Sequence, residues 1–261
     1  KARYVIHANG FLNRPKLPAM KGINDYTGHT FHTSRWDYDY TGGDSNGNLD
    51  NLKDKTVAII GTGATAVQCV PHLAAGAKKL YVFQRTPSSI DERNNTNTDI
   101  DWFKSQKDGW QEERRENFEG FLTGNFTSKD LVNDGWTEIF RTILGGLIKN
   151  GPPKLTILGW VITAPFYKHF YKVGLKEFIR NKFMKFVSRE DINQKVEIVD
   201  FQKMEKVRAR ADKLVKDPKT AESLKPYYRQ LCKRPCFHDE YLQAFNNDNV
   251  ELIDTDGQGV K

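Results

Sequence analysis

A glycine-rich segment in the first quarter of the chain has the residue types and spacing of a phosphate-binding turn. Gly61-x-Gly63-x-x-Ala66 follows the apolar run 57–60 and precedes a stretch of helical composition from Ala64 to Ala75. In dinucleotide-binding folds the first glycine allows a tight turn, the second lets the backbone approach a pyrophosphate, and the third small residue lets helix and strand pack closely. The N–H groups and the dipole at the helix start then face the phosphates. An ordinary glycine-rich turn is the alternative interpretation.

The end of the following strand indicates which dinucleotide this turn would bind. Arg85 comes directly after the run 80–84, and no acidic residue lies between Leu80 and Thr86. Sites for NAD place an acidic residue near this point to bind the ribose hydroxyls, whereas sites for NADP use an arginine that pairs with the 2′-phosphate. The sequence therefore predicts NADP(H). A solvated arginine at a strand end is the alternative.

The elements that must position these residues form a strand–helix–strand unit. The runs 57–60 and 80–83 are short and apolar, which is typical of buried parallel strands. The helix between them contains Pro71, which we expect to kink it or to end its first part. Two further segments, Tyr4-Val5-Ile6 and 250–253, also have strand patterns.

Between Ile90 and about Pro226 strand patterns are scarce, and the composition favours helices. We expect helices over four long stretches and one short one: 102–121, 136–149, 158–189, 197–216 and 239–245. The predicted fold class is α/β, with a Rossmann-like parallel sheet interrupted by a mainly helical insertion.

Composition excludes several classes of function. The 40 Lys+Arg against 33 Asp+Glu give a net charge of +7, but without a basic cluster, so nucleic acid is not an expected partner. Three cysteines without a CxxC pair indicate neither a disulfide framework nor a zinc site, and a cytoplasmic location is the simpler expectation. His29 and His32 have no third metal ligand nearby, so we expect no metal. The longest apolar stretch, 155–170, is interrupted and short, so we expect no membrane span.

A second motif lies upstream of the glycine turn. The stretch Tyr26-x-Gly28-x-x-x-His32-x-x-x-Trp36-Asp37 resembles the fingerprint of the flavin-dependent Baeyer–Villiger monooxygenases, which ends in Pro or Asp. In that family the stretch links two nucleotide-binding domains, and its histidine and tryptophan organise the linker during the catalytic cycle. Without the resemblance, His32 would read as a loop histidine with a backbone partner, and Trp36 as a core anchor.

The resemblance extends over essentially the whole chain. The segments 61–68 and 82–87 are similar to the family's NADP site, and 8–12 is similar to the end of its flavin domain, with Asn9 where Thr is usual. The resemblance implies the following cofactor-binding residues: Gly61, Thr62, Gly63, Ala64, Thr65, Ala66, Gln68, Arg85, Thr86 and Lys233.

A Lys-Arg pair near the end of the chain also matches the family, in Cys232-Lys233-Arg234-Pro235. The resemblance implies that Lys233 contacts the 2′-phosphate with Arg85 and Thr86, and that Arg234 is the catalytic arginine. A guanidinium is permanently charged and suits the stabilisation of developing negative charge. Without the resemblance, the pair would read as two exposed charges.

The resemblance implies a separate role for each of four segments of the chain. Residues 1–37 would be the end of an FAD domain with the linker, 38–89 and 227–261 the NADP-binding parts, and 90–226 the helical insertion. The cofactors would be NADP(H) and FAD, and the substrates a ketone or other small apolar molecule and O2, giving an ester or lactone. No first GxGxxG for FAD is present, so we expect a fragment, inactive alone, whose partner is the missing FAD domain of the same polypeptide.

Two other functions stay open at this point. A related flavin monooxygenase could act on nitrogen or sulfur, although Trp36-Asp37 argues against it. A non-catalytic NADP-binding module could use the same strand–helix–strand unit.

Overall fold

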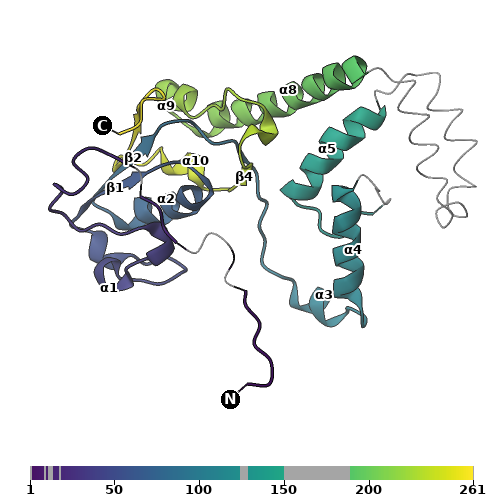
Figure 1. Cartoon of the computed structure of the whole chain (residues 1–261), viewed down its shortest axis with the longest axis horizontal. Coiled ribbons are helices and arrows are strands. Elements are labelled where there is room, and N and C mark those ends of the chain that lie inside the picture. Colours follow the sequence, from purple (N-terminus) through teal and green to yellow (C-terminus); the bar gives the residue numbers. More distant parts are fainter. Residues whose placement is uncertain are drawn as a thin grey trace, which may run out of the picture. The chain divides into compact units, whose positions relative to one another are not determined.

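The computed structural model describes most of the chain and divides into two compact units (Figure 1). The described residues are 2–8, 10, 14–17, 19–123, 129–149 and 189–260. The sheet unit comprises Lys1–Pro87 and Glu240–Lys261, and the helical unit comprises Ser88–Asp239. The second division falls after Asp239, since residues 227–239 bond and pair with other parts of the helical unit. The functional assignments of the four segments stay predictions.

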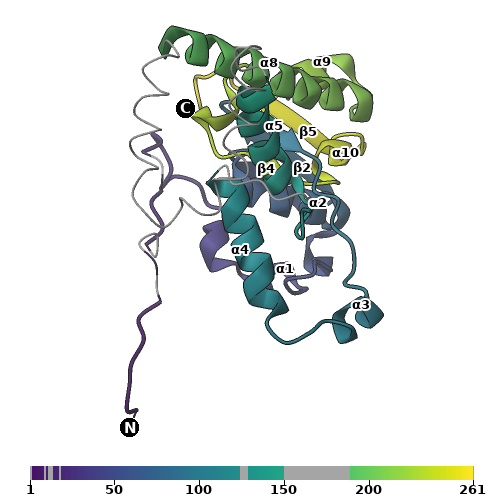
Figure 2. The same ribbon diagram turned by 90° about the vertical axis from the view of Figure 1, so that its right-hand side faces the viewer.

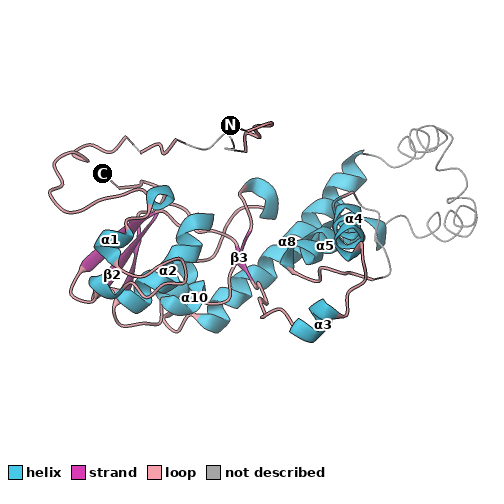
Figure 3. Cartoon of the chain, turned by 90° about the horizontal axis from the view of Figure 1, so that it is seen from below, coloured by secondary structure: helices cyan, strands magenta, loops and turns pink. Residues whose placement is uncertain are grey.

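The sheet unit is built on three parallel strands in the order β1-β2-β5. Figure 3 draws the strands in magenta and labels β2. The strands are β1 (Thr56–Ile60), β2 (Lys79–Gln84) and β5 (Val250–Asp254). Ile60 pairs with Phe83, and Phe83 pairs with Ile253, so the three carboxyl ends lie at one edge. In sequence, the helical unit lies between β2 and β5. The prediction of an α/β fold with a parallel sheet interrupted by a mainly helical insertion is confirmed.

A 13-residue helix, α2 (Ala64–Gly76), connects β1 to β2. Its buried side chains recur at helical spacing, including Val67, Val70 and Leu73, while Leu80 and Val82 of β2 are fully buried. The short helix α10 (Tyr241–Ala244) packs against α2 (Figure 2). The helix continues through Pro71, so this proline does not end the first part of the helix, which was one of its two expected effects: buried residues on both sides keep both turns packed.

Short elements precede β1. They are η1 (Thr33–Arg35), α1 (Tyr38–Thr41) and η2 (Asp50–Leu52). The strand expected at Tyr4-Val5-Ile6 is wrong, because these residues pair with none of the described strands and their exposed fractions are 80%, 73% and 89%. An apolar triplet forms a strand only where another strand accepts its backbone bonds.

The helical unit contains α3 (Ile100–Lys104), α4 (Trp110–Leu122), α5 (Gly135–Lys149), α8 (Arg189–Leu214), α9 (Pro218–Ser223) and η3 (Gln230–Cys232). The helix expected over 102–121 is two helices, because Gly109 adopts a left-handed conformation with φ +86°. The helices expected over 136–149 and 197–216 are confirmed within α5 and α8. The helix expected over 158–189 lies outside the described residues, apart from Arg189.

Two strands of the helical unit were not foreseen. β3 (Ile90–Asp91) pairs in parallel with β4 (Cys236–Phe237). Each strand has only two residues, which is too short for an alternating pattern to be visible in the sequence. At Gly135 a Cβ would lie 2.4 Å from the ring of Phe237, so the start of α5 approaches β4 as closely as only glycine permits.

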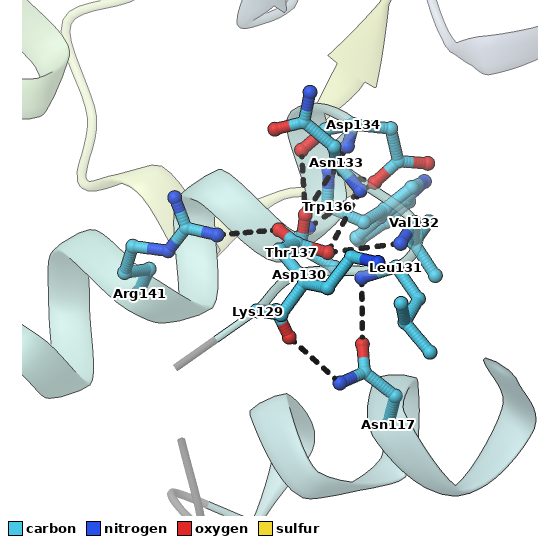
Figure 4. A network of polar contacts seen from close by, with 10 residues as sticks. All are labelled: Asn117, Lys129, Asp130, Leu131, Val132, Asn133, Asp134, Trp136, Thr137 and Arg141. Carbon is cyan, nitrogen blue, oxygen red and sulfur yellow. Dashed lines mark hydrogen bonds and ion pairs between the residues drawn. The ribbon is translucent and has the colours of Figure 1, made fainter. Parts of the chain in front are cut away.

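The loop residues 129–134, which precede α5, are held by polar side chains (Figure 4). Asp130 accepts hydrogen bonds from the backbone of Val132 (3.0 Å) and Asn133 (2.7 Å) and pairs with Arg141 at 2.5 Å. Burial raises the pKa of Asp130, but hydrogen bonds from Thr137 and from the backbone outweigh it, so the pKa lies below its ordinary value. The carboxylate therefore stabilises this loop in its charged form.

Helix α8 carries two cationic residues that contact the β3–β4 pair. Lys203 is 2% exposed and lies 2.5 Å from Asp91 of β3 and 3.2 Å from Glu138 of α5. Arg210 donates to the carbonyls of Ile90 (3.3 Å) and His238 (3.0 Å). These contacts join α8 to β3 and to the residue that follows β4.

No helix among the described residues has the length and apolarity needed to cross a membrane. The apolar stretch 155–170 lies outside them.

Candidate functional site

The glycine turn lies at the carboxyl end of β1, where its backbone conformation requires glycine. Gly61 has φ +107°, which residues with side chains rarely adopt, and its N–H donates to the carbonyl of Phe83 at 2.9 Å. Gly63 is the N-cap of α2, in an extended conformation with φ −76°. Chain neighbours aside, a Cβ added at either glycine would meet no atom of the described residues within 4 Å. The space in front of both glycines is therefore open.

The start of α2 offers hydrogen-bond donors to this open space. No side chain caps the helix, and its first intrahelical bond runs from the N–H of Val67 to the carbonyl of Gly63. The N–H groups of Ala64, Thr65 and Ala66 therefore have no acceptor within the helix. Ala66 is 7% exposed, as expected of a small residue at a close helix contact. Such a helix start suits a pyrophosphate.

Arg85 lies at the same edge of the sheet, one strand away from the turn. The hydroxyl of the buried Thr62 donates to the carbonyl of Thr86 at 2.9 Å, which ties the turn to the end of β2. The side chain of Arg85 is exposed, and its guanidinium forms no ion pair or hydrogen bond with the described part of the chain. An unpaired guanidinium beside an uncapped helix start is the donor set that a dinucleotide with a 2′-phosphate needs. The residues present thus fit NADP(H).

Gln68 has a different contact from its neighbours. Its side-chain amide donates to the carbonyl of Ala64 within α2 at 3.0 Å, and the side chain is exposed. Its cofactor-binding role stays a prediction.

The sequence interpretation missed the loop after β5, which reaches the same edge. Thr255 donates to the carbonyl of Gln84 through its N–H (2.9 Å) and its hydroxyl (2.8 Å). The N–H of Gly259 donates to the Thr255 hydroxyl at 3.0 Å, and a Cβ at Gly259 would lie 3.9 Å from Cδ of Arg85. The loop therefore borders the stem of Arg85. The sequence feature that could have indicated this loop was the prediction of a parallel sheet, because a parallel sheet brings the carboxyl ends of its strands to one edge.

Tyr26 and Gly28 of the fingerprint are in direct contact. A Cβ at Gly28 would lie 2.3 Å from the hydroxyl of Tyr26 and 2.4 Å from Cζ of its ring. No side chain fits at position 28 while the ring keeps this place. A side chain at position 28 would therefore require the exposed ring of Tyr26 to move.

Three fingerprint residues make hydrogen bonds to short helices. His32 and Asp37 each cap the start of one, and Trp36 bonds to a residue of α1. Nδ1 of His32 accepts from the N–H of Ser34 at 3.1 Å and caps η1, so a neutral ring carries its proton on Nε2. The half-buried Trp36 donates from Nε1 to the hydroxyl of Thr41 at 3.0 Å. Asp37 caps α1 by accepting from the N–H of Tyr40 at 3.0 Å. These contacts match the plain interpretation of His32 as a loop histidine with a backbone partner.

Lys233 and Arg234 belong to the helical unit, and their implied roles stay predictions. Both are exposed, directly after η3, and Nζ of Lys233 lies 5.0 Å from the centre of the Tyr228 ring. The Tyr228 hydroxyl accepts from the N–H of Ser89 at 2.9 Å, and burial raises the pKa of Tyr228 to about 12. Tyr228 is therefore uncharged at neutral pH, with its ring available to the lysine.

Comparison with known proteins identifies relatives over the whole chain. No protein-family model matches it. A Baeyer-Villiger monooxygenase of Stachybotrys chlorohalonatus is 52% identical over 260 residues, which are 100% of this chain and 36% of that protein. A polycyclic ketone monooxygenase from the thermophilic fungus Thermothelomyces thermophila matches with a TM-score of 0.74 and 41% identity, covering 100% of this chain and 37% of that one. A structure of OTEMO in complex with FAD and NADP matches with a TM-score of 0.54 and 25% identity, covering 95% and 41%.

The resemblance that the fingerprint indicated is thereby confirmed. The chain spans little more than a third of the length of the curated relative and of the polycyclic ketone monooxygenase that it matches. Over its whole length this chain is similar to Baeyer-Villiger monooxygenases, and it corresponds to only part of the length of those relatives.

Proposed function

We propose that the chain is the NADP(H)-binding part of an FAD- and NADPH-dependent monooxygenase that inserts oxygen next to a ketone carbonyl. The reaction converts a ketone, O2, NADPH and a proton into an ester or lactone, water and NADP+. NADP- and FAD-dependence is supported by the bound cofactors of the similar OTEMO structure. The substrate class is supported by the names of the matching ketone and Baeyer-Villiger monooxygenases.

One observation carries the proposal. The open glycine turn, the uncapped start of α2 and the unpaired guanidinium of Arg85 lie at one carboxyl edge of a parallel sheet. A crevice outside the carboxyl ends of the strands is where open α/β sheets bind ligands. The donors of α2 suit a pyrophosphate, and Arg85 suits a phosphate on the ribose. NADPH is the ligand that needs both.

In the proposed reaction the chain's residues bind, orient and stabilise charge. The backbone from Gly61 to Ala66 holds the pyrophosphate, and Arg85 with Thr86 selects the 2′-phosphate. Lys233 adds a second cation for that phosphate. Arg234 is the catalytic residue: its permanent charge stabilises negative charge that develops on the ketone oxygen. When bound, NADPH supplies the hydride and FAD passes the electrons to oxygen.

The test is an assay of the full-length protein with NADPH and a panel of cyclic and polycyclic ketones under ¹⁸O2. We expect ketone-dependent NADPH oxidation and a product that carries one ¹⁸O. Arg234→Ala should lower kcat by more than about 100-fold, the scale of losing one transition-state contact. Arg229→Ala is the matched control, because Arg229 is an exposed arginine of the same unit that pairs with Glu197. Its activity should match the parent.

Three outcomes would contradict the proposal. Oxygen transfer to amines or sulfides but not to ketones would identify a nitrogen- or sulfur-oxidising enzyme. NADP+ binding without any NADPH oxidation would leave a non-catalytic module. Full activity of the Arg234→Ala variant would remove that residue from the reaction.

A further inference from the structure

His29 lies inside the fingerprint stretch but is not one of its five defining residues. Two contacts hold its ring. Nε2 donates to Oδ2 of Asp37 at 2.9 Å, and the ring stacks on Tyr40 with centres 3.8 Å apart and planes 15° apart. A third ring, Phe31, lies with its centre 5.8 Å from that of His29. The imidazole is thus oriented by a stack and by a directional bond together.

The bond from His29 completes the environment of Asp37. One carboxylate oxygen, Oδ1, accepts the N–H of Tyr40 and caps α1, while the other faces His29. A carboxylate bound at both oxygens has a fixed orientation. His29 and Tyr40 both donate hydrogen bonds to Asp37, and their rings also stack on each other.

The contacts of Asp37 continue to Trp36 and to the start of the sheet. The Thr41 hydroxyl contacts the carbonyl of Asp37 at 2.9 Å and accepts from Nε1 of Trp36 at 3.0 Å. Nζ of Lys55, the residue before β1, lies 5.7 Å from the centre of the Tyr40 ring. The position of Trp36 relative to β1 therefore depends on α1, which Asp37 and His29 hold.

We propose that His29 is a positioning residue: it orients Asp37, and through Asp37 and α1 it places the fingerprint tryptophan, Trp36, against the first strand of the sheet. This inference rests on the proposed function, since the placement of Trp36 affects a reaction only in a monooxygenase of this family. The role depends on Asp37. The fingerprint also admits Pro at that position, which has no oxygen for His29 to bond.

The alternative interpretation is that His29 and Asp37 form an exposed surface pair that affects neither stability nor the position of Trp36. The side chains of His29 and Asp37 are 36% and 34% exposed, and exposed ion pairs often contribute little to stability. The stack on Tyr40 separates the two interpretations, because it restricts the ring before the bond forms and so lowers the entropy lost on bonding. A coupling between His29 and Asp37 is therefore the quantity to measure.

The experiment is a double-mutant cycle in the full-length protein, with His29→Phe and Asp37→Pro. His29→Phe keeps a ring on Tyr40 and removes both ring nitrogens, including the Nε2 that bonds to Asp37. We expect it to lower kcat for NADPH-dependent ketone oxidation about five- to ten-fold, with KM for NADPH unchanged within about two-fold, as for contacting residues that couple. In the Asp37→Pro background the same change should alter kcat by less than about two-fold. His29→Gln, which keeps a donor, should recover part of the rate.

Equal losses in both backgrounds, or no loss in either, would overturn the proposal. A second readout needs no activity: hydrogen exchange of the Tyr40 amide, which donates to Asp37. His29→Phe should speed this exchange about five-fold with Asp37 present and leave it unchanged with Pro at that position. A parent protein that oxidises no ketone would refute the proposed function, and the exchange measurement would then decide the role of His29 separately. Unchanged exchange would overturn it.

Discussion

The sheet unit and the helical unit hold their polar residues in place by different means. In the sheet unit, the main chain places the candidate site: Gly61 bonds to Phe83, and parallel strand ends bring the turn and Arg85 to one edge. In the helical unit, buried or partly buried charges join segments that are distant in the sequence, as Lys203 does with Asp91 and Glu138. The position of the glycine turn follows from residue types that are close in the sequence. The ion pairs of Lys203 form only when distant segments pack together in the folded protein.

This difference has a consequence for substitutions. A change at Gly63 should affect binding while leaving the fold intact, because its φ of −76° suits residues with side chains and a Cβ there meets no described atom within 4 Å. A change in a buried network of the helical unit should affect folding first, because it leaves a charge without its partner. Four substitutions, two in each unit, test this contrast.

The largest effect is expected for Gly63→Val in the sheet unit. The backbone at φ −76° accepts a side chain, and a Cβ there has no described atom within 4 Å, so the added methyl groups would fill the space in front of α2. The Kd for NADP+, from isothermal titration of the full-length protein, should rise by more than about 100-fold. The melting temperature should change little. The control is Ala75→Val, exposed near the other end of the same helix, which should bind as the parent does. Unchanged binding by Gly63→Val would remove the turn from the site.

Lys203→Met tests the helical unit. Lys203 is 2% exposed, and its loss removes the cation that contacts a buried oxygen of Asp91. The free energy of unfolding, from urea titration followed by circular dichroism, should fall by about 3 kcal/mol.

The matched control for this variant is Arg115→Met. Arg115 also joins two carboxylates, Glu112 and Glu119, but all three side chains are exposed. Its replacement should leave stability nearly unchanged. Equal losses for the two variants would show that burial of the network is unimportant, and the contrast between the units would fail.

Arg85→Ala sharpens the assignment of the coenzyme. The loss of a charge-assisted contact to the 2′-phosphate should raise the Kd for NADP+ about 10- to 100-fold. The Kd for NAD+, which lacks that phosphate, should stay within about two-fold of the parent. Fluorescence titration with both coenzymes measures the ratio. Lys78→Ala, an exposed cation before β2, serves as the control. A parallel weakening of both coenzymes by Arg85→Ala would assign the arginine a general structural role.

Asp130→Asn should have the smallest effect, and it should depend on pH. The folded-state pKa of Asp130 lies below its ordinary value of 3.8, since hydrogen bonds from Thr137 and the backbone outweigh burial. The charged form therefore contributes stability above that value, and the contribution is lost as the pH falls through the folded-state pKa. At neutral pH the variant should lose about 1 kcal/mol at most. Urea titrations at several pH values should show the difference closing below 3.8. A difference independent of pH would contradict the assignment.

The sequence by itself determined the parts of the molecule that depend on local residue types. The glycine turn, the helix after it and the strands on either side were predictable, because Gly61 and Gly63 have a backbone role and the apolar runs 57–60 and 80–83 have a periodicity. The family fingerprint was visible for the same reason, and the whole-chain relatives bear it out.

Only the tertiary structure decided which distant residues meet. The loop from Thr255 to Gly259 reaches Arg85 because β5 lies next to β2, and strand order is not encoded in any local pattern. The two-residue strands β3 and β4 exist because each satisfies the backbone of the other. Tyr4-Val5-Ile6 shows the reverse: a strand pattern without a partner strand stays unpaired.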